Sequence, residues 1–335
     1  MVRDILLIKQ TSLGDVVHAT AAIRSVRLAY PKARIAVLTS TTAADVLNPS
    51  EDIDDLLTFD RYRVKANWWR RPLWTIGHIS KTIKQVRRTR FDIAIDLQGS
   101  WKTVIFLWAA RTQNRFVKGR WWFAKRFHQP KLHAVDEMEG VLMLSGIDPQ
   151  QHHPVLTLKD EDREKAASLL AELPINKRKL AIFCPTTRWP TKNWPLQNYL
   201  ALAEKLKDHF YVVFTGSPDD KAVIDKWIAT TSPSKVKNLA GSLSLREFFA
   251  LMSSADLVVT GDSLPMHAAS AFGRPLVALF GPTDEALVGP RSKNSFVLRA
   301  DVNCVRCYRR RSCEKDCISA ISIEAVSSAI QKVGA

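Results

Sequence analysis

Short apolar segments alternate with helical patterns along almost the whole chain of 335 residues. The first unit is an apolar strand, Ile5–Ile8, followed by a turn and a helical pattern from Asp15 to Ala29. The alternation continues with expected strands and helices at 33–38, 42–47, 55–59, 76–90 and 91–96. Strands that alternate with helices in this way indicate a parallel sheet covered by helices on both faces.

The same alternation begins again after a polar stretch, residues 160–179, which we interpret as a linker region. Strands are expected at 180–183, 211–215, 236–239, 257–260, 276–280 and 295–298, with helices at 196–210, 219–229, 245–255, 265–272 and 323–333. The chain is about twice as long as a usual domain. We therefore predict an α/β fold of two Rossmann-like, doubly wound domains, 1–173 and 174–335, which face a shared cleft and bind ligands beyond the carboxyl ends of their strands.

The positive charge of the chain is concentrated in one segment. The sequence holds 49 Lys and Arg against 33 Asp and Glu, a net charge of +16. Residues 61–131, called the basic segment below, hold 18 of these cations, only two acids, and seven of the ten tryptophans. Such a segment favours an anionic partner: nucleic acid, an anionic membrane surface or a phosphorylated lipid-linked substrate. The alternative is a solvated basic face above core tryptophans.

Several classes of protein are not supported by the sequence. The longest apolar run, Val104 to Ala110, is too short to cross a bilayer, and the start MVRDILLIKQ does not resemble a signal peptide. We therefore expect a cytosolic chain. Neither a Walker P-loop nor a G-x-G-x-x-G after the first strand is present, so an NTPase and an ordinary NAD enzyme are not indicated.

Two strand ends in the second half carry polar residues suited to phosphate. In the later one, Asp262 and Ser263 precede an expected helix that contains His267, with Pro265 in its first turn. A helix N-terminus presents unpaired N–H groups and a partial positive charge, which favour an anion. The alternatives are an N-cap for Asp262 or Ser263 and a half-buried core histidine for His267.

The earlier polar cluster follows the first strand of the second half. Thr186 and Thr187 supply hydroxyl groups there, and Lys192 supplies a mobile charge that suits a diphosphate. The alternative is a surface loop with one exposed lysine. In the first half, Asp15 ends the turn after the first strand, where a carboxylate can accept the proton of an attacking hydroxyl. The alternative for Asp15 is a helix N-cap.

These residues belong to five motifs that occur in the order of a known family. The motifs are IKQTSLGDVVH at 8–18, DLQG at 96–99, TTRWPTKNWP at 186–195, DSLPMH at 262–267 and LFGPTD at 279–284. Together they resemble the ADP-heptose lipopolysaccharide heptosyltransferases, glycosyltransferase family 9. The first motif, together with Arg61, Arg63, Lys65 and the Lys118-Gly119-Arg120 run, looks most like the heptosyltransferase I branch.

The resemblance implies a GT-B fold, with the lipid-linked acceptor in the first domain and ADP-heptose in the second. Asp15 would be the general base, and Asp219 or Asp220 would take the ribose. The donor diphosphate would be held by Thr186, Thr187, Lys192, Ser263 and His267, with Asp262 in the same motif. The acceptor would be bound by Arg61, Arg63, Lys65 and Arg120. The chain departs from the first-heptose enzymes at Leu264, where they usually have glycine.

From the residues and the resemblance we predict an inverting glycosyltransferase that moves heptose from ADP-heptose to the Kdo or heptose of the lipopolysaccharide inner core. It would need no cofactor for the chemistry, bind no nucleic acid, and act as a peripheral protein at the anionic inner face of the inner membrane. The alternative function is a nucleic-acid-binding or membrane-surface protein that uses the basic segment.

A cysteine cluster near the C-terminus is the second departure from the simplest first-heptose enzymes. Four cysteines lie within a short span, at Cys304, Cys307, Cys313 and Cys317. In a reducing cytosol, thiolates that can converge on one tetrahedral ion favour metal ligation over disulfides, and we predict a structural zinc or iron site. The alternative is a set of reduced thiols in a surface loop.

Overall fold

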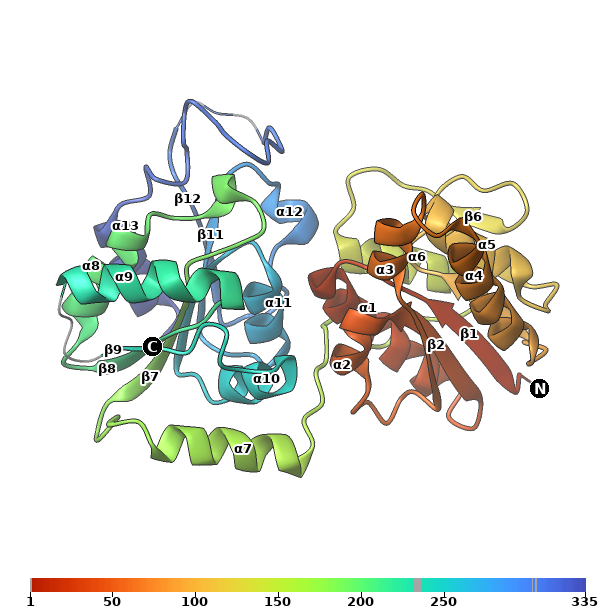
Figure 1. The fold of residues 1–335 in the computed structure, drawn as a ribbon, viewed down its shortest axis with the longest axis horizontal. Coiled ribbons are helices and arrows are strands. Elements are labelled where there is room, and N and C mark those ends of the chain that lie inside the picture. Colours follow the sequence, from red (N-terminus) through yellow and green to blue (C-terminus); the bar gives the residue numbers. More distant parts are fainter. Residues whose placement is uncertain (1, 232–235, 303, 305) are drawn as a thin grey trace. The chain divides into compact units, whose positions relative to one another are not determined.

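The chain forms two compact units in the computed structural model, Met1–Thr157 and Leu158–Ala335. The structure describes residues 2–231, 236–302, 304 and 306–335. Figure 1 shows that each unit has its own sheet with helices packed against it. Within the described residues, every helix is too short or too polar to cross a membrane.

The first unit is built on a six-stranded parallel sheet of order β3-β2-β1-β4-β5-β6. Its strands are β1 (Asp4–Ile8), β2 (Arg34–Ser40), β3 (Asp55–Phe59), β4 (Ile93–Asp96), β5 (Arg115–Lys118) and β6 (Lys125–Phe127). Its helices are α1 (Leu13–Ala29), α2 (Ala44–Leu47), α3 (Arg61–Asn67), α4 (Pro72–Arg87), α5 (Trp101–Ala109) and α6 (Ala134–Leu144). Leu6 and Ile8 of β1 share one buried core with residues of α3, α4 and α5, so these three helices cover one face of the sheet.

The second unit repeats this design with the strand order β12-β11-β10-β7-β8-β9, again all parallel. Its strands are β7 (Lys179–Cys184), β8 (Phe210–Phe214), β9 (Val236–Asn238), β10 (Leu257–Gly261), β11 (Leu276–Phe280) and β12 (Ser295–Arg299). Its helices are α7 (Asp160–Ala171), α8 (Leu196–Leu206), α9 (Lys221–Thr231), α10 (Leu245–Ser253), α11 (Leu264–Ala271), α12 (Glu285–Val288) and α13 (Ile323–Lys332). Central strands without an exposed face explain why this half of the sequence has continuous apolar runs.

The division between the units falls before α7 and not at 173/174, where the sequence led us to expect it. Residues 151–155 belong to the first unit because the N–H of Val155 donates to Thr20 Oγ1 and that of Gln151 to Ser25 Oγ, both on α1. The polar stretch that we interpreted as a linker is largely helical. Its helix α7 packs on α10, and Arg246 of α10 pairs with Asp162 of α7.

The elements themselves lie close to the predicted positions, with differences at the ends. The helix expected over 196–210 ends at Leu206, because the chain then enters β8 at Phe210. Several elements of the basic segment were not predicted, namely α3, α5, β5 and β6, and neither was α6 beyond it. Their sequences are short or rich in cations, which hides the periodicity of an amphipathic element.

The pair between Asp162 and Arg246 should be a main anchor of α7. Both side chains are largely shielded, at 10% and 17% exposure. Asp162→Ala should therefore destabilise the second unit by about 1.5 to 3 kcal/mol, the worth of a hydrogen bond to a charged group. Lys165→Ala, which removes an exposed ion pair with Glu161 on the same helix, is the control and should leave the melting temperature nearly unchanged. Equal melting temperatures for the two variants would contradict the assignment.

Candidate active site

The predicted site residues follow the carboxyl ends of strands in both sheets. In the second sheet, β7 and β10 are neighbours from which the strand order runs in opposite directions, so the loops after them diverge. In the first sheet, β1 and β4 occupy the equivalent place. Crevices at such points are the usual ligand sites of open parallel sheets. Each unit therefore has its candidate residues at the topologically expected position.

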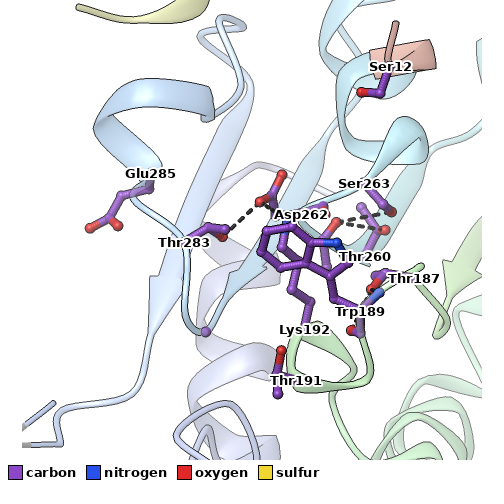
Figure 2. Close-up of polar contacts among 12 residues, drawn as sticks. Ser12, Thr187, Trp189, Thr191, Lys192, Thr260, Asp262, Ser263, Thr283 and Glu285 are labelled. Atoms are coloured by element: carbon purple, nitrogen blue, oxygen red, sulfur yellow. Dashed lines mark hydrogen bonds and ion pairs between the residues drawn. The ribbon is translucent and has the colours of Figure 1, made fainter. Parts of the chain in front are cut away.

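Lys192 and Asp262 form a shielded ion pair at this point of the second sheet. Lys192 Nζ lies 2.6 Å from Asp262 Oδ2, and their side chains are 13% and 6% exposed. Thr283, which follows β11, donates its hydroxyl to the same carboxylate oxygen at 2.7 Å. Figure 2 shows the three side chains converging from separate loops. The loops after β7, β10 and β11 are thus joined through one carboxylate.

Trp189 is in contact with two cations. Lys192 Nζ lies 4.3 Å from the centre of the Trp189 ring, and the guanidinium carbon of Arg310 lies 4.7 Å from it. The loop around Trp189 is fixed by Thr187, whose N–H donates to Asn193 Oδ1 at 2.8 Å and whose hydroxyl donates to the Trp189 carbonyl at 2.9 Å. The ring thus restricts the Lys192 side chain by cation–π contact, in addition to the ion pair with Asp262.

Close packing of backbone brings this loop to the end of β10. A Cβ atom placed on Gly261 would lie 2.7 Å from the carbonyl oxygen of Lys192, which no real side chain tolerates. Glycine at 261 is therefore needed for the loop to approach the strand. Sequence analysis did not single out Gly261, because the approach of the Lys192 carbonyl is visible only in the structure.

Ser263 and His267 begin α11, as predicted. Ser263 is the N-cap residue, although its side chain makes no capping hydrogen bond. Its hydroxyl instead lies 3.5 Å from the Gly261 carbonyl (Figure 2). His267 is buried one turn into the helix. Leu264 is the first residue of α11. The helix N-terminus adds a partial positive charge beside Lys192 and Asp262.

The loop after β8 distinguishes Asp219 from Asp220. Asp220 Oδ2 accepts hydrogen bonds from both the N–H and the hydroxyl of Ser217, at 2.7 and 2.6 Å. Asp220 therefore caps the turn that precedes α9, whereas Asp219 is exposed. Thr186 lies against the same loop, because a Cβ on Gly216 would be 3.3 Å from Thr186 Oγ1. Of the two carboxylates, Asp220 is the one whose Oδ2 is already bonded within its own loop.

Asp15 is the third residue of α1, and Ser12 is the N-cap. Asp15 Oδ2 accepts from the N–H of Ser12 at 2.6 Å and from its hydroxyl at 2.9 Å. The carboxylate is thus part of a capping box, which is a variant of the N-cap alternative. The side chain is half-buried at the carboxyl end of β1. This position suits either a structural or a catalytic carboxylate.

Two buried charges beside Asp15 were not recognised as site residues from the sequence. Lys9 follows β1 directly, and Asp96 ends the neighbouring strand β4. Burial lowers the pKa of Lys9, and the Asp15 carboxylate acts in the opposite direction. Burial raises the pKa of Asp96 to about 6, although its Oδ1 accepts the N–H groups of Gln98 and Gly99. Charged residues at the ends of two adjacent apolar strands were the signal that could have identified them.

The four predicted acceptor residues lie at the same sheet edge. Arg61, Arg63 and Lys65 are on α3, immediately after β3, and Arg120 follows β5. The Arg63 guanidinium lies 5.0 Å from the Trp74 ring centre, and Arg120 Nη2 lies 3.0 Å from His128 Nε2. Because all strands are parallel, these cations flank the central strand that leads to Asp15 on both sides.

The cysteine cluster lies in the loop between β12 and α13. Cys317 is buried and the other three cysteines are half-buried. Burial raises the pKa of the Cys317 thiol, with the Cys304, Cys313 and Cys307 thiols acting in the same direction. Over residues 2–231, 236–302, 304 and 306–335, however, the structure contains no group of three or more His, Cys, Asp or Glu arranged to hold a metal ion. The zinc or iron site predicted from the sequence is therefore unsupported.

The same loop packs against the candidate site of the second unit. The Thr191 hydroxyl donates to the carbonyl of Arg309 at 2.6 Å, and the N–H of Tyr308 donates to that of Pro282 at 3.0 Å. Burial raises the pKa of Glu285, but hydrogen bonds from Arg306 and Arg299 outweigh it and lower the value to about 2. The loop that bears the cysteines is thus part of the wall around Trp189.

The raised pKa of Asp96 predicts a pH effect on stability. In the unfolded chain this carboxyl ionises near pH 3.8, and in the folded chain near pH 6, so the folded state holds its proton more tightly. Stability should fall by about 2.4 kcal/mol from this group as the pH rises from 4 to 7. Asp96→Asn cannot ionise and should lose that part of the fall. Urea unfolding of both proteins at several pH values tests this, and parallel pH profiles would contradict it.

Comparison with known proteins identifies the fold and the family of the chain. Residues 79–318 match the family model "Glycosyltransferase family 9 (heptosyltransferase)". The lipopolysaccharide heptosyltransferase 3 of Escherichia coli is 26% identical over 296 residues, which is 84% of each chain. A glycosyltransferase family 9 structure from Veillonella parvula is 21% identical, with a TM-score of 0.82 over 99% of this chain and 97% of that one. The E. coli ADP-heptose lipopolysaccharide heptosyltransferase II structure is 23% identical, with a TM-score of 0.78 over 98% of both. The predicted GT-B fold is confirmed, and the chain belongs to glycosyltransferase family 9, the heptosyltransferases.

Proposed function

We propose that this glycosyltransferase moves heptose from ADP-heptose to a sugar of the lipopolysaccharide inner core, Kdo or heptose, with inversion at the anomeric carbon. The observation that carries the proposal is the shielded Lys192–Asp262 pair beside the N-terminus of α11. A lysine and a helix N-terminus at one strand end form a site for a diphosphate. The relatives named above act on lipopolysaccharide by their names, which supports the acceptor class.

Binding of the donor would use the second unit. The diphosphate would accept hydrogen bonds from Lys192, from the Ser263 hydroxyl, and from the first N–H groups of α11, with Thr186, Thr187 and His267 around it. Asp262 would hold the Lys192 side chain in place beside the phosphates. Asp219 would accept from the ribose hydroxyls, because Asp220 is already bonded to Ser217. No cofactor is part of this scheme.

In the reaction, the acceptor hydroxyl oxygen forms a bond to the anomeric carbon of heptose as the bond from that carbon to the diphosphate oxygen breaks. The electron pair of the broken bond leaves with ADP, whose added negative charge is stabilised by Lys192 and α11. The hydroxyl proton goes to the carboxylate of Asp15. Arg61, Arg63, Lys65 and Arg120 would hold the anionic groups of the acceptor beside it. Attack opposite the leaving group inverts the configuration.

The place of action that we propose is the cytoplasmic side of the inner membrane, with the protein attached peripherally. An acceptor with a lipid anchor is confined to a bilayer, so the enzyme must reach its surface. The cations of the basic segment support attraction to anionic lipids. The same cations would serve a nucleic-acid-binding protein, which is the alternative that the tests below address.

The general base is tested by Asp15→Asn. This change removes the proton acceptor and should lower turnover by roughly a hundredfold or more, while ADP affinity stays nearly the same. Ser12→Ala is the matched control, because it removes a partner of the Asp15 carboxylate in the capping box but not the carboxylate. It should reduce thermal stability and keep most of the turnover. If Asp15→Asn lowers only stability, the residue is a cap.

The separation of donor and acceptor sites is tested with one variant in the second unit and two in the first. Lys192→Ala should weaken ADP binding by about 1.5 to 3 kcal/mol in calorimetry, the worth of a hydrogen bond to a charged group. Arg63→Ala and Arg120→Ala should instead raise the acceptor KM and leave ADP binding unchanged. Should all three variants change the same constant, the two roles are assigned to the wrong units.

A further inference from the structure

The outer surface of helices α4 and α5 carries apolar side chains that nothing in the first unit covers. On α4, Leu73 and Ile76 are 84% and 60% exposed. On α5, Trp101, Ile105 and Trp108 are 65%, 39% and 63% exposed. Their spacing of four and three residues places the three α5 side chains on one side of that helix, opposite the buried Thr103, Phe106 and Leu107.

The two helices pack side by side on the same face of the sheet. Figure 1 shows them together in the first unit. The buried side of α4 is formed by Thr75, Thr82 and Val86, so Leu73 and Ile76 point away from the sheet as the α5 tryptophans do. We call this outward surface the α4–α5 face. Trp69, in the turn before α4, adds a side chain that is 88% exposed.

Cations without carboxylate partners surround these apolar groups. Lys84 and Arg87 continue the exposed side of α4, and Arg88 and Lys81 lie next to them. Of the cations at 61–131, all within the described part of the chain, Lys118 alone has a carboxylate partner, Glu137. Of the two acids of this segment, Asp96 is buried, and Asp92, whose carboxylate accepts the N–H groups of Arg3 and Asp4, offsets only one of the cations.

The face ends at a polar hollow lined by several arginines. A cavity of about 450 Å³ lies where α4 and α5 end, and Arg87, Arg90, Arg111, Arg115, Asp92 and Trp108 line it. The Arg115 guanidinium is bonded to the carbonyls of Leu107 and Ala110, which leaves Arg87, Arg90 and Arg111 to meet an anion. A cation at a helix C-terminus stabilises the helix through its dipole, but this effect does not account for three arginines around one hollow at the ends of two helices.

We propose that the α4–α5 face is the surface by which the protein docks on a bilayer of anionic phospholipid, with a headgroup phosphate in the arginine hollow. Exposed tryptophans beside aliphatic side chains and unpaired cations match the boundary between headgroups and acyl chains. A second copy of the chain does not fit, because two such cationic faces would repel each other. Leu73 and Ile76 also favour a bilayer over nucleic acid, which has no apolar layer to receive them.

This proposal rests on the proposed function only in that a lipid-linked acceptor requires a membrane surface. Its test therefore uses vesicles that contain neither donor nor acceptor. The full chain is sedimented with vesicles of phosphatidylcholine alone or mixed with phosphatidylglycerol, at several salt concentrations. The wild-type protein should bind the anionic vesicles at least tenfold more tightly than the neutral ones, and high salt should weaken the binding.

Two double variants divide the face into its apolar and cationic parts. Leu73→Ser with Ile76→Ser should lower the affinity for anionic vesicles by tenfold or more, through lost apolar burial. Arg87→Gln with Arg111→Gln should lower it by roughly fivefold for each arginine and reduce the dependence on salt. The controls are Val223→Ser, an exposed aliphatic on α9, and Arg163→Gln with Lys177→Gln, exposed cations of the second unit; both should bind as the wild type does.

A fluorescence measurement distinguishes loss of membrane contact from loss of folded structure. Trp108 should contribute a blue shift when anionic vesicles are added, and Trp108→Phe should lose that part while its circular dichroism is unchanged. Heptose transfer to a short, lipid-free acceptor should be equal in wild type and both double variants. The proposal is overturned if the protein binds neutral and anionic vesicles equally, or if the double variants bind as the wild type does. It is also overturned if the protein forms a dimer that only Leu73→Ser with Ile76→Ser dissociates, or if it binds single-stranded DNA more tightly than vesicles.

Discussion

Parallel strand pairing is the constraint on which both candidate sites depend. Because every strand of each sheet runs the same way, the loops after all six strands emerge at one edge. Residues far apart in sequence, such as Lys192 and Asp262, are brought within hydrogen-bond distance by the pairing of β7 with β10. In the first unit the pairing of β1 with β4 brings Lys9 and Asp96 to the same edge. The strand order of each sheet thus decides which loops can bring their side chains together.

A shielded ion pair such as Lys192–Asp262 contributes little net stability, because removing both charges from water costs about as much as their attraction returns. Its value is in positioning. Thr283 bonds to Asp262 and Trp189 packs against Lys192, so the ammonium group is held from two sides at the start of α11. The conformational freedom of the Lys192 side chain is already reduced, so this side chain would lose less entropy when an anion binds there.

The sequence predicted the fold class, the order of the main elements and the strand ends that carry the candidate residues. These features follow from local patterns, such as the apolar runs of β7 and β10 and the proline in the first turn of α11. The boundary between the units and the helix α7 were missed because they depend on contacts between distant residues, Asp162 with Arg246 and Thr20 with Val155. The different surroundings of Asp219 and Asp220 also required coordinates, since only the Ser217 contacts distinguish two adjacent carboxylates.

The basic segment shows how one composition can serve two surfaces. Seven tryptophans and 18 cations look uniform along the sequence, but the fold separates them. Trp74 is half-buried against the core and stacks with Arg63, a predicted acceptor residue after β3, whereas Trp101 and Trp108 face away from the sheet. Helices α4 and α5 both run from the carboxyl edge of the sheet to its amino edge, so their outer face begins beside the residues predicted to bind the acceptor. An acceptor anchored in a bilayer that contacts this face would have its sugars close to the sheet edge that carries Asp15.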